Sequence, residues 1–134
     1  MTSIATAPAA PKAQIAGWAL TGLLTALFMI DAGMKLIVVQ PVIDGSMMMG
    51  WPTDTGTIRT LGLVLLISTV LYAVPRTAFL GAILLTGYLG GAVSAHVRVA
   101  DPLFTHTLFG VYLGIAVWGA LWLRDTRLRT LIPL

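Results

Sequence analysis

Four long apolar segments constrain the fold of this chain more than any other feature. They cover residues 15–39, 58–74, 77–99 and 103–123, and prolines or charged residues bound them. A helix needs about 20 mainly apolar residues to cross a hydrocarbon core about 30 Å thick. Only 10% of the 134 residues are charged, whereas soluble domains carry about 25%. We therefore predict an all-α integral membrane protein.

The connections between these segments predict how they pack. The second and third segments are separated only by Pro75 and Arg76, so they must be antiparallel neighbours. We expect a four-helix bundle with antiparallel up-down spans, in which residues 15–123 form a single transmembrane domain. Residues 1–14 are rich in Ala, Thr and Pro and are expected to form a flexible arm, and residues 124–134 a basic tail. The run after Lys12 is too long for the apolar core of a signal peptide, which favours its retention as the first span.

The basic residues indicate an orientation rather than a nucleic-acid surface. Eight Lys and Arg oppose five Asp, giving a formal net charge of +3, and no Glu is present. In so apolar a chain this excess is typical of membrane topology, with cytoplasmic loops carrying more Lys and Arg. We therefore expect both termini in the cytoplasm and no nucleic-acid partner. The residues that carry this bias are Lys12, Arg76, Arg124, Arg127 and Arg129.

The absence of Cys excludes several kinds of chemistry. The chain cannot form a disulfide, a Cys-ligated metal centre, an iron–sulfur cluster or a thiol nucleophile. Any redox role would need a bound cofactor to carry the electrons. The run Met47–Met49 offers thioethers to copper, but such a run is more typical of an interfacial loop, and we predict no metal site.

Antiparallel threading gathers six charged or titratable residues at the end of the bundle away from the termini. Ionisable groups in a membrane span are costly and call for partners or a function. Residues 31 and 35 have two possible interpretations. They form an ion pair that holds the first helix against a neighbouring helix, or they form the polar part of a ligand-binding site. The candidate ligand-binding residues are Asp31, Lys35, Arg59, His96, Arg98 and His106.

Helical periodicity suggests which of these residues face inward. Gly87, Gly91 and Ala95 share one face of the third span and are expected to pack closely against a neighbouring helix. Arg98 falls on the same face and is expected to point inward, as is His106 from the fourth span. His96 lies about 200° from Arg98, which predicts an interfacial side chain or one turned toward the following loop. Haem ligation by both histidines is disfavoured for the same reason.

The sequence resembles the DoxX-like family of small four-span bacterial membrane proteins. The resemblance covers about residues 15–125 and is most specific in GYLGGAVSAHVR at Gly87–Arg98. Other matching motifs are DAGMKL at Asp31–Leu36, MGWP at Met49–Pro52 and SAHVRVADP at Ser94–Pro102. The resemblance implies a four-helix bundle in the bacterial inner membrane. It also implies that His96, Arg98 and Asp101 belong to the polar signature that follows the family's third span.

Related DoxX proteins are associated with quinone-linked sulfur oxidation and oxidative-stress complexes, and a distant branch with receptor assembly. Our first hypothesis is a quinone- or small-ligand-binding accessory subunit, associated with the bilayer and with other membrane or respiratory-complex subunits, rather than an independent enzyme. The alternative is a structural or chaperone-like bundle whose polar cluster only fixes helix packing. A small transporter ranks lower, because the cytoplasmic half of the spans offers only hydroxyl groups such as Thr21, Ser68 and Tyr72.

Overall fold

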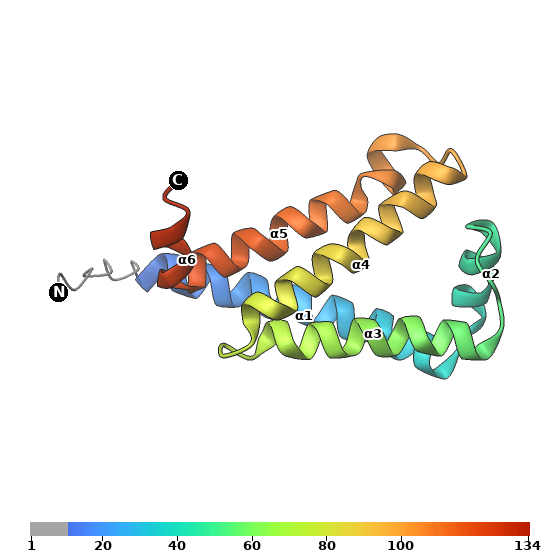
Figure 1. Ribbon diagram of the computed structural model, residues 1–134, viewed down its shortest axis with the longest axis horizontal. Coiled ribbons are helices and arrows are strands. Elements are labelled where there is room, and N and C mark those ends of the chain that lie inside the picture. Colours follow the sequence, from blue (N-terminus) through green and yellow to red (C-terminus); the bar gives the residue numbers. More distant parts are fainter. Residues whose placement is uncertain (1–10) are drawn as a thin grey trace.

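A computed structural model describes residues 11–134, and within that range the chain is all-helical with no β-strand (Figure 1). Two short helices accompany the long ones, and a π-helical turn, η1, precedes the last long helix. Four of these helical segments are long and apolar enough to cross a membrane, which confirms the predicted fold class. The elements are α1 (Pro11–Ile37), α2 (Gln40–Met48), α3 (Thr55–Ala73), α4 (Ala78–Arg98), η1 (Leu103–Thr107), α5 (Phe109–Arg124) and α6 (Thr126–Leu131).

Helix boundaries differ from the expected ones at both ends of the chain. Helix α1 includes residues 11–14, which were predicted to belong to the flexible arm. The rest of the predicted flexible arm, residues 1–10, lies outside the described residues. Residues 126–131 of the predicted tail form helix α6, which Asp125 caps by accepting a hydrogen bond from the backbone N–H of Arg127.

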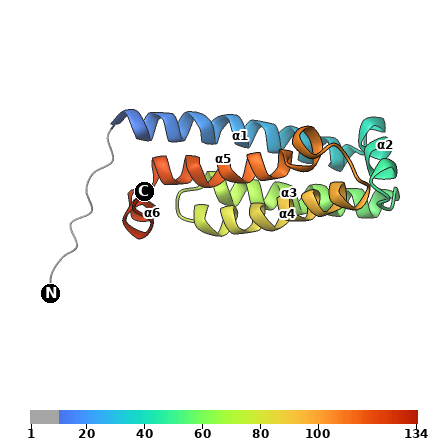
Figure 2. The same cartoon turned by 90° about the horizontal axis from the view of Figure 1, so that it is seen from above.

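The four long helices form a ring in which each packs against two others. Helix α1 contacts α3 and α5, and α4 contacts the same two helices from the other side. Figure 1 shows that α4 and α5 diverge from α1 and α3 toward the end that carries α2, and Figure 2 shows the same bundle from above. We call this the α2 end, and the opposite end, which carries α6 and the α3–α4 turn, the terminal end.

Apolar side chains occupy both the inside and the outside of the bundle. The core contains Leu24, Phe28, Leu65, Leu85 and Leu121, all at most 4% exposed. Outward-facing apolar residues remain open, so hydrocarbon tails rather than water suit this surface. Those that are more than half exposed on the long helices include Leu23, Ile30, Ile83 and Ile115.

Close helix contacts depend on glycines other than the two predicted on the third span. A Cβ on Gly62 would lie 2.8 Å from Cβ of Lys35, and one on Gly17 would lie 2.7 Å from the backbone nitrogen of Arg124. By contrast, a Cβ on Gly87 or Gly91 would meet nothing within 4 Å. The expected packing role of these two glycines is therefore wrong, because α4 packs on α5 through Leu89 and Val93, which face Gly110.

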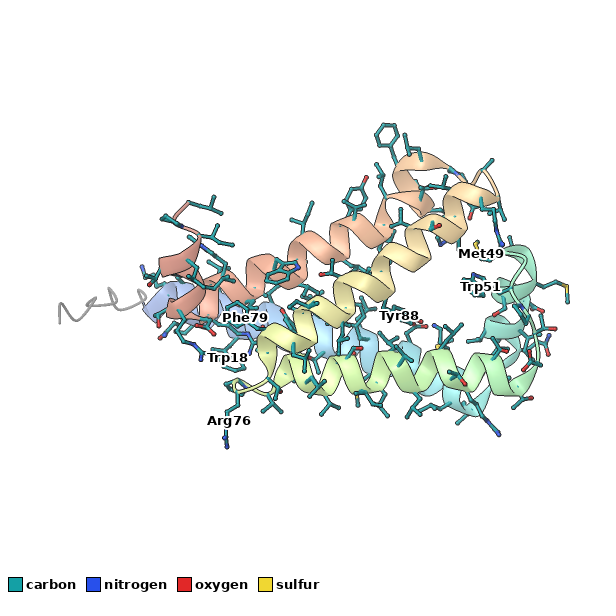
Figure 3. The ribbon with its side chains drawn as sticks, in the orientation of Figure 1. Trp18, Met49, Trp51, Arg76, Phe79 and Tyr88 are labelled. Carbon is teal, nitrogen blue, oxygen red and sulfur yellow. The ribbon has the colours of Figure 1, made fainter. Side chains whose placement is uncertain are left out.

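Arg124 belongs to the core of the terminal end rather than to a solvated tail. Its side chain is buried, and its guanidinium donates a 2.6 Å hydrogen bond to the carbonyl oxygen of Tyr72 at the end of α3. The guanidinium also stacks over Trp18 at 4.5 Å and over the Tyr72 ring at 4.9 Å from the ring centroids. Arg124 thus joins α1, α3 and α5, while Arg76 projects from the α3–α4 turn away from the bundle (Figure 3).

Arg124→Met is expected to destabilise the folded protein by about 2 kcal/mol, because it leaves a buried carbonyl without its donor and removes two cation–π contacts. The methionine side chain keeps much of the apolar packing, so the loss of stability measures the contribution of the guanidinium group. Thermal unfolding in detergent, followed by the fluorescence of Trp18 and its neighbours, measures the change. Arg127→Met is the matched control, since Arg127 is exposed and its guanidinium bonds to Asp125. Equal melting temperatures for the two variants would contradict this account.

Asp54 fixes the start of α3 at the α2 end. Its carboxylate accepts a 2.8 Å hydrogen bond from the backbone N–H of Thr57, and this bond lowers the pKa of the Asp54 carboxyl below its ordinary value. Such a cap satisfies one of the free N–H groups in the first helical turn. The α2–α3 connection is therefore anchored directly beside the opening of the bundle.

Candidate functional site

The divergence of the helices leaves a cavity of about 730 Å³ at the α2 end. Residues of α1 and α2 line one side of this cavity, and residues of α4, η1 and α5 line the other. Most of the lining is apolar, and a few polar side chains interrupt it. This combination is typical of sites that take small organic molecules.

Asp31 and Lys35 supply the polar part of the α1 wall. Lys35 Nζ donates a 2.5 Å hydrogen bond to an Asp31 carboxylate oxygen one helical turn away. The Lys35 side chain is 17% exposed and that of Asp31 is 44% exposed, so the carboxylate is the more accessible partner. The close approach of Gly62 to the Lys35 stem holds this wall against α3.

His96 supplies the polar part of the α4 wall, and the chain turn after α4 fixes its ring. Ala100 adopts a left-handed conformation (φ 56°), which reverses the chain so that the Asp101 N–H bonds to the His96 carbonyl oxygen at 3.2 Å. The Asp101 carboxylate then lies 2.6 Å from His96 Nδ1. A left-handed alanine is costly, and this turn brings a carboxylate directly against the imidazole.

His106 lies on the π-helical turn η1 and completes the same wall. The His96 and His106 ring centroids are 6.3 Å apart. Thr105 Oγ1 lies 2.8 Å from His106 Nδ1, and a hydroxyl can either donate to this nitrogen or accept from it. Single π-helical turns are frequent at functional sites, and here the turn places the second imidazole at the cavity.

Aromatic and glycine residues shape the rest of the cavity. Phe28, Tyr88 and Phe109 line it from three helices, and Trp51 lines it from the α2–α3 loop. Figure 3 shows Tyr88 extending from α4 toward the space between the two helix pairs, with Met49 and Trp51 on the facing loop. Gly91, without a side chain, leaves part of the α4 wall flat.

Two of the six candidate residues lie outside this cavity. The Arg59 guanidinium donates at 3.0 Å to the carbonyl oxygen of Leu36 at the end of α1. Arg98 is the last residue of α4, and its guanidinium donates a hydrogen bond to the carbonyl oxygen of Met49, directly after α2. The expectation that Arg98 points inward is wrong, because its long side chain reaches the α2–α3 loop. The structure brings together Asp31, Lys35, His96 and His106.

His96 is turned toward the following loop, as one of its two predicted alternatives states, because its Nδ1 contacts Asp101. Periodicity did not predict that His96 also lines the cavity. The cavity-lining face of α4 is wide: it contains the predicted face of Gly87, Gly91 and Ala95 and extends beyond it to His96. Tyr88 and Trp51 were not predicted as site residues. Tyr88 lies within the family-like motif GYLGG, which was the one signal that pointed toward it.

Metal binding has no geometric basis in the described part of the chain. Among residues 11–134 no three His, Cys, Asp or Glu side chains come together in a way that could hold a metal ion. The polar groups of the cavity are instead arranged as separate hydrogen-bonding positions on two facing walls. This arrangement suits an organic ligand with one or two polar substituents.

Fold and cavity together define a multi-pass membrane protein with a partly polar cavity at one end of a four-helix bundle. The model of the DoxX-like family matches residues 19–120, and the chain therefore belongs to the DoxX-like family. No curated protein and no solved structure matches the chain. The matched range contains α2, α3, α4 and η1 entirely and most of α1 and α5, so it includes every residue of the cavity.

Proposed function

We propose that this protein binds a small, ring-bearing amphipathic molecule of the membrane, with the quinone class as the best match. The observation that carries the proposal is the cavity at the α2 end, which combines an apolar lining with Asp31, Lys35, His96 and His106 on its two facing walls. A quinone needs an apolar slot for its ring and tail and hydrogen-bonding partners for its two oxygens. The cavity supplies both.

The size and lining of the cavity support this ligand class. A volume of about 730 Å³ lies within the range of roughly 300–1,000 Å³ that small-molecule sites occupy. Phe28, Trp51 and Phe109 offer aromatic faces, which favour offset stacking against a ring. The sulfur atoms of Met34 and Met49 on the same walls also make favourable contacts with aromatic rings.

The residues present suit binding rather than independent catalysis. Without Cys the chain has no thiol that could pass electrons, so a redox role requires the ligand to carry them to another protein. We therefore propose an accessory subunit that holds a ligand for membrane redox or oxidative-stress functions in a larger assembly. The cavity residues orient the ring and exclude water from it.

The contacts of Arg59 and Arg98 favour a structural role for part of the polar cluster. Both guanidinium groups bond to backbone carbonyl oxygens at the α2 end and thereby connect α1 with α3 and α4 with the α2–α3 loop. These two residues support the alternative hypothesis of a structural bundle, in which the polar residues stabilise the packing of the helices. The other four candidates lie at the cavity and fit the ligand-binding proposal.

For orientation, we propose a location in the bacterial inner membrane with both termini in the cytoplasm. The support is the basic excess of the terminal end, where Arg76, Arg127 and Arg129 lie, under the positive-inside rule. Because the native chain has no Cys, single-cysteine variants report sidedness directly. A membrane-impermeant maleimide should label Thr53→Cys but not Arg76→Cys in cells whose outer membrane is permeabilised. The reverse labelling pattern would overturn the orientation.

Direct titration tests the ligand proposal. The purified protein is placed in phospholipid nanodiscs and titrated calorimetrically with a decyl-substituted benzoquinone and with the corresponding hydroquinone under anaerobic conditions. We expect saturable binding of at least one of the two probes at about one molecule per chain. Heat no larger than that of empty nanodiscs for both probes would overturn the proposal and leave the structural alternative.

A further inference from the structure

The contact between Asp101 and His96 determines which hydrogen-bonding group His96 presents to the cavity. The Asp101 carboxylate, 2.6 Å from His96 Nδ1, is an acceptor, so the proton of a neutral imidazole lies on Nδ1. The other ring nitrogen, Nε2, is then an acceptor. This carboxylate–histidine pair therefore fixes the tautomer of His96 in the same way that carboxylates fix metal-binding or catalytic histidines.

The positions of Asp101 and the cavity around His96 indicate where its free nitrogen lies. His96 lines the cavity and Asp101 does not, so the ring edge opposite the carboxylate faces the open space. Among the described residues, His96 Nε2 has no hydrogen-bond partner. An acceptor at this position favours a ligand group that donates, such as a hydroxyl, and disfavours a carbonyl oxygen, which can only accept.

Of the other charged or titratable groups of the cavity, all but Lys35 are compatible with this preference. Lys35 Nζ gives one of its three N–H donors to Asp31, and the more exposed Asp31 carboxylate is a second acceptor on the facing wall. His106 is adaptable, because the Thr105 hydroxyl beside its Nδ1 permits either tautomer. The Tyr88 hydroxyl can donate or accept. His96 and Asp31 are therefore acceptors on the two facing walls, Lys35 is a fixed donor, and the adaptable groups match either kind of ligand.

We propose that His96, oriented by Asp101, is the specificity-determining acceptor for an aromatic hydroxyl, so that the cavity takes the reduced, phenolic form of a ring in preference to its oxidised carbonyl form. This inference rests on the proposed function and adds the chemical class of the ligand group. The aromatic character follows from the rings of Phe28, Trp51 and Phe109 around the cavity. His96 touches the ligand, and Asp101 acts through His96 as a positioning residue.

Three matched probes test this selectivity on the full chain in nanodiscs at pH 8 without oxygen. They are a decyl hydroquinone, its quinone, and its dimethyl ether, which keeps the ring but has no hydroxyl to donate. Since one neutral hydrogen bond contributes about 1 kcal/mol, we expect the hydroquinone to bind five- to tenfold more tightly than either of the other probes. Quinone or ether binding that equals or exceeds hydroquinone binding would overturn the inference.

Variants separate the roles of the two residues. His96→Gln offers both a donor and an acceptor, so the ratio of hydroquinone to quinone affinity should fall to about one. Asp101→Ala frees the tautomer and should lower the same ratio while quinone binding persists. Arg59→Gln, at the same end but outside the cavity, should leave the ratio unchanged. An unchanged ratio in His96→Gln would overturn the assignment.

The outcomes also distinguish this inference from the proposed function. If none of the three probes binds, the proposed function fails and the inference falls with it. If the quinone binds with a measurable affinity but no weaker than the hydroquinone, the proposed function stands and only the selectivity assigned to His96 fails. The folded state of each variant is checked by its elution profile and its helical circular dichroism.

Discussion

Gly91→Leu is expected to weaken binding of the ring-bearing ligand by about 100-fold, equivalent to about 2.8 kcal/mol, while the fold remains intact. Gly91 lines the cavity, and a Cβ at this position meets nothing within 4 Å. The leucine side chain can therefore enter the cavity without displacing any helix and occupy the space of the ring. The calorimetric titration described above measures the loss.

Gly90→Leu is the matched control for this substitution. Gly90 precedes Gly91 on α4, also has open space at its Cβ, and lines a separate apolar groove formed by α4, α5 and α6. The two variants add the same side chain to adjacent positions on different faces of one helix. We expect Gly90→Leu to bind the probe like the unmodified protein. Equal loss in both variants, or in neither, would contradict the placement of the ligand in the cavity at the α2 end.

Gly81→Ala is expected to abolish most of the folded yield although it adds only one methyl group. A Cβ on Gly81 would clash with the backbone nitrogen and the Cα of Tyr72. Backbone atoms cannot move aside like a flexible side chain, so α3 and α4 would have to separate beside their short connection. Overpacking of well-packed sites costs about 1–3 kcal/mol, occasionally more, and a clash with backbone belongs at the upper end. The monodisperse fraction in size-exclusion chromatography measures the effect.

Gly87→Ala provides the control for Gly81→Ala on the same helix. Its added methyl group meets nothing within 4 Å, and alanine favours a helix over glycine by about 1 kcal/mol. This variant should therefore be expressed at least as well as the unmodified protein and melt at the same or a higher temperature. A normal yield for Gly81→Ala would show that the α3–α4 contact is looser than described.

The spans and their order were predictable because their signals are local. Apolar runs define the long helices, and Pro75 ends the second predicted span within one residue of where α3 ends. The gathering of Asp31, Lys35 and His106 at one end follows from antiparallel threading alone. These features need no knowledge of how the helices tilt, which explains why the sequence predicts them.

Which side chains line the cavity, and what they contact, depends on the tertiary arrangement of the helices, which helical periodicity in the sequence does not predict. The divergence of α4 and α5 from α1 and α3 turns Gly91 from an expected packing residue into part of a cavity wall. The left-handed Ala100 brings Asp101 against His96, and no local pattern marks an alanine for that conformation. Arg124 was predicted only as one of the basic residues that set the orientation in the membrane, but aromatic rings from two other helices enclose its guanidinium.

Mass spectrometry of the small molecules retained by the protein tests the central claim most directly. The unmodified protein and Gly91→Leu are purified in parallel from the same native membranes under anaerobic conditions, and their organic extracts are compared. We expect a ring-bearing membrane lipid of the quinone class, enriched in its hydroquinone form, with the unmodified protein and not with Gly91→Leu. Equal amounts of every extracted molecule in both preparations would contradict a ligand in this cavity.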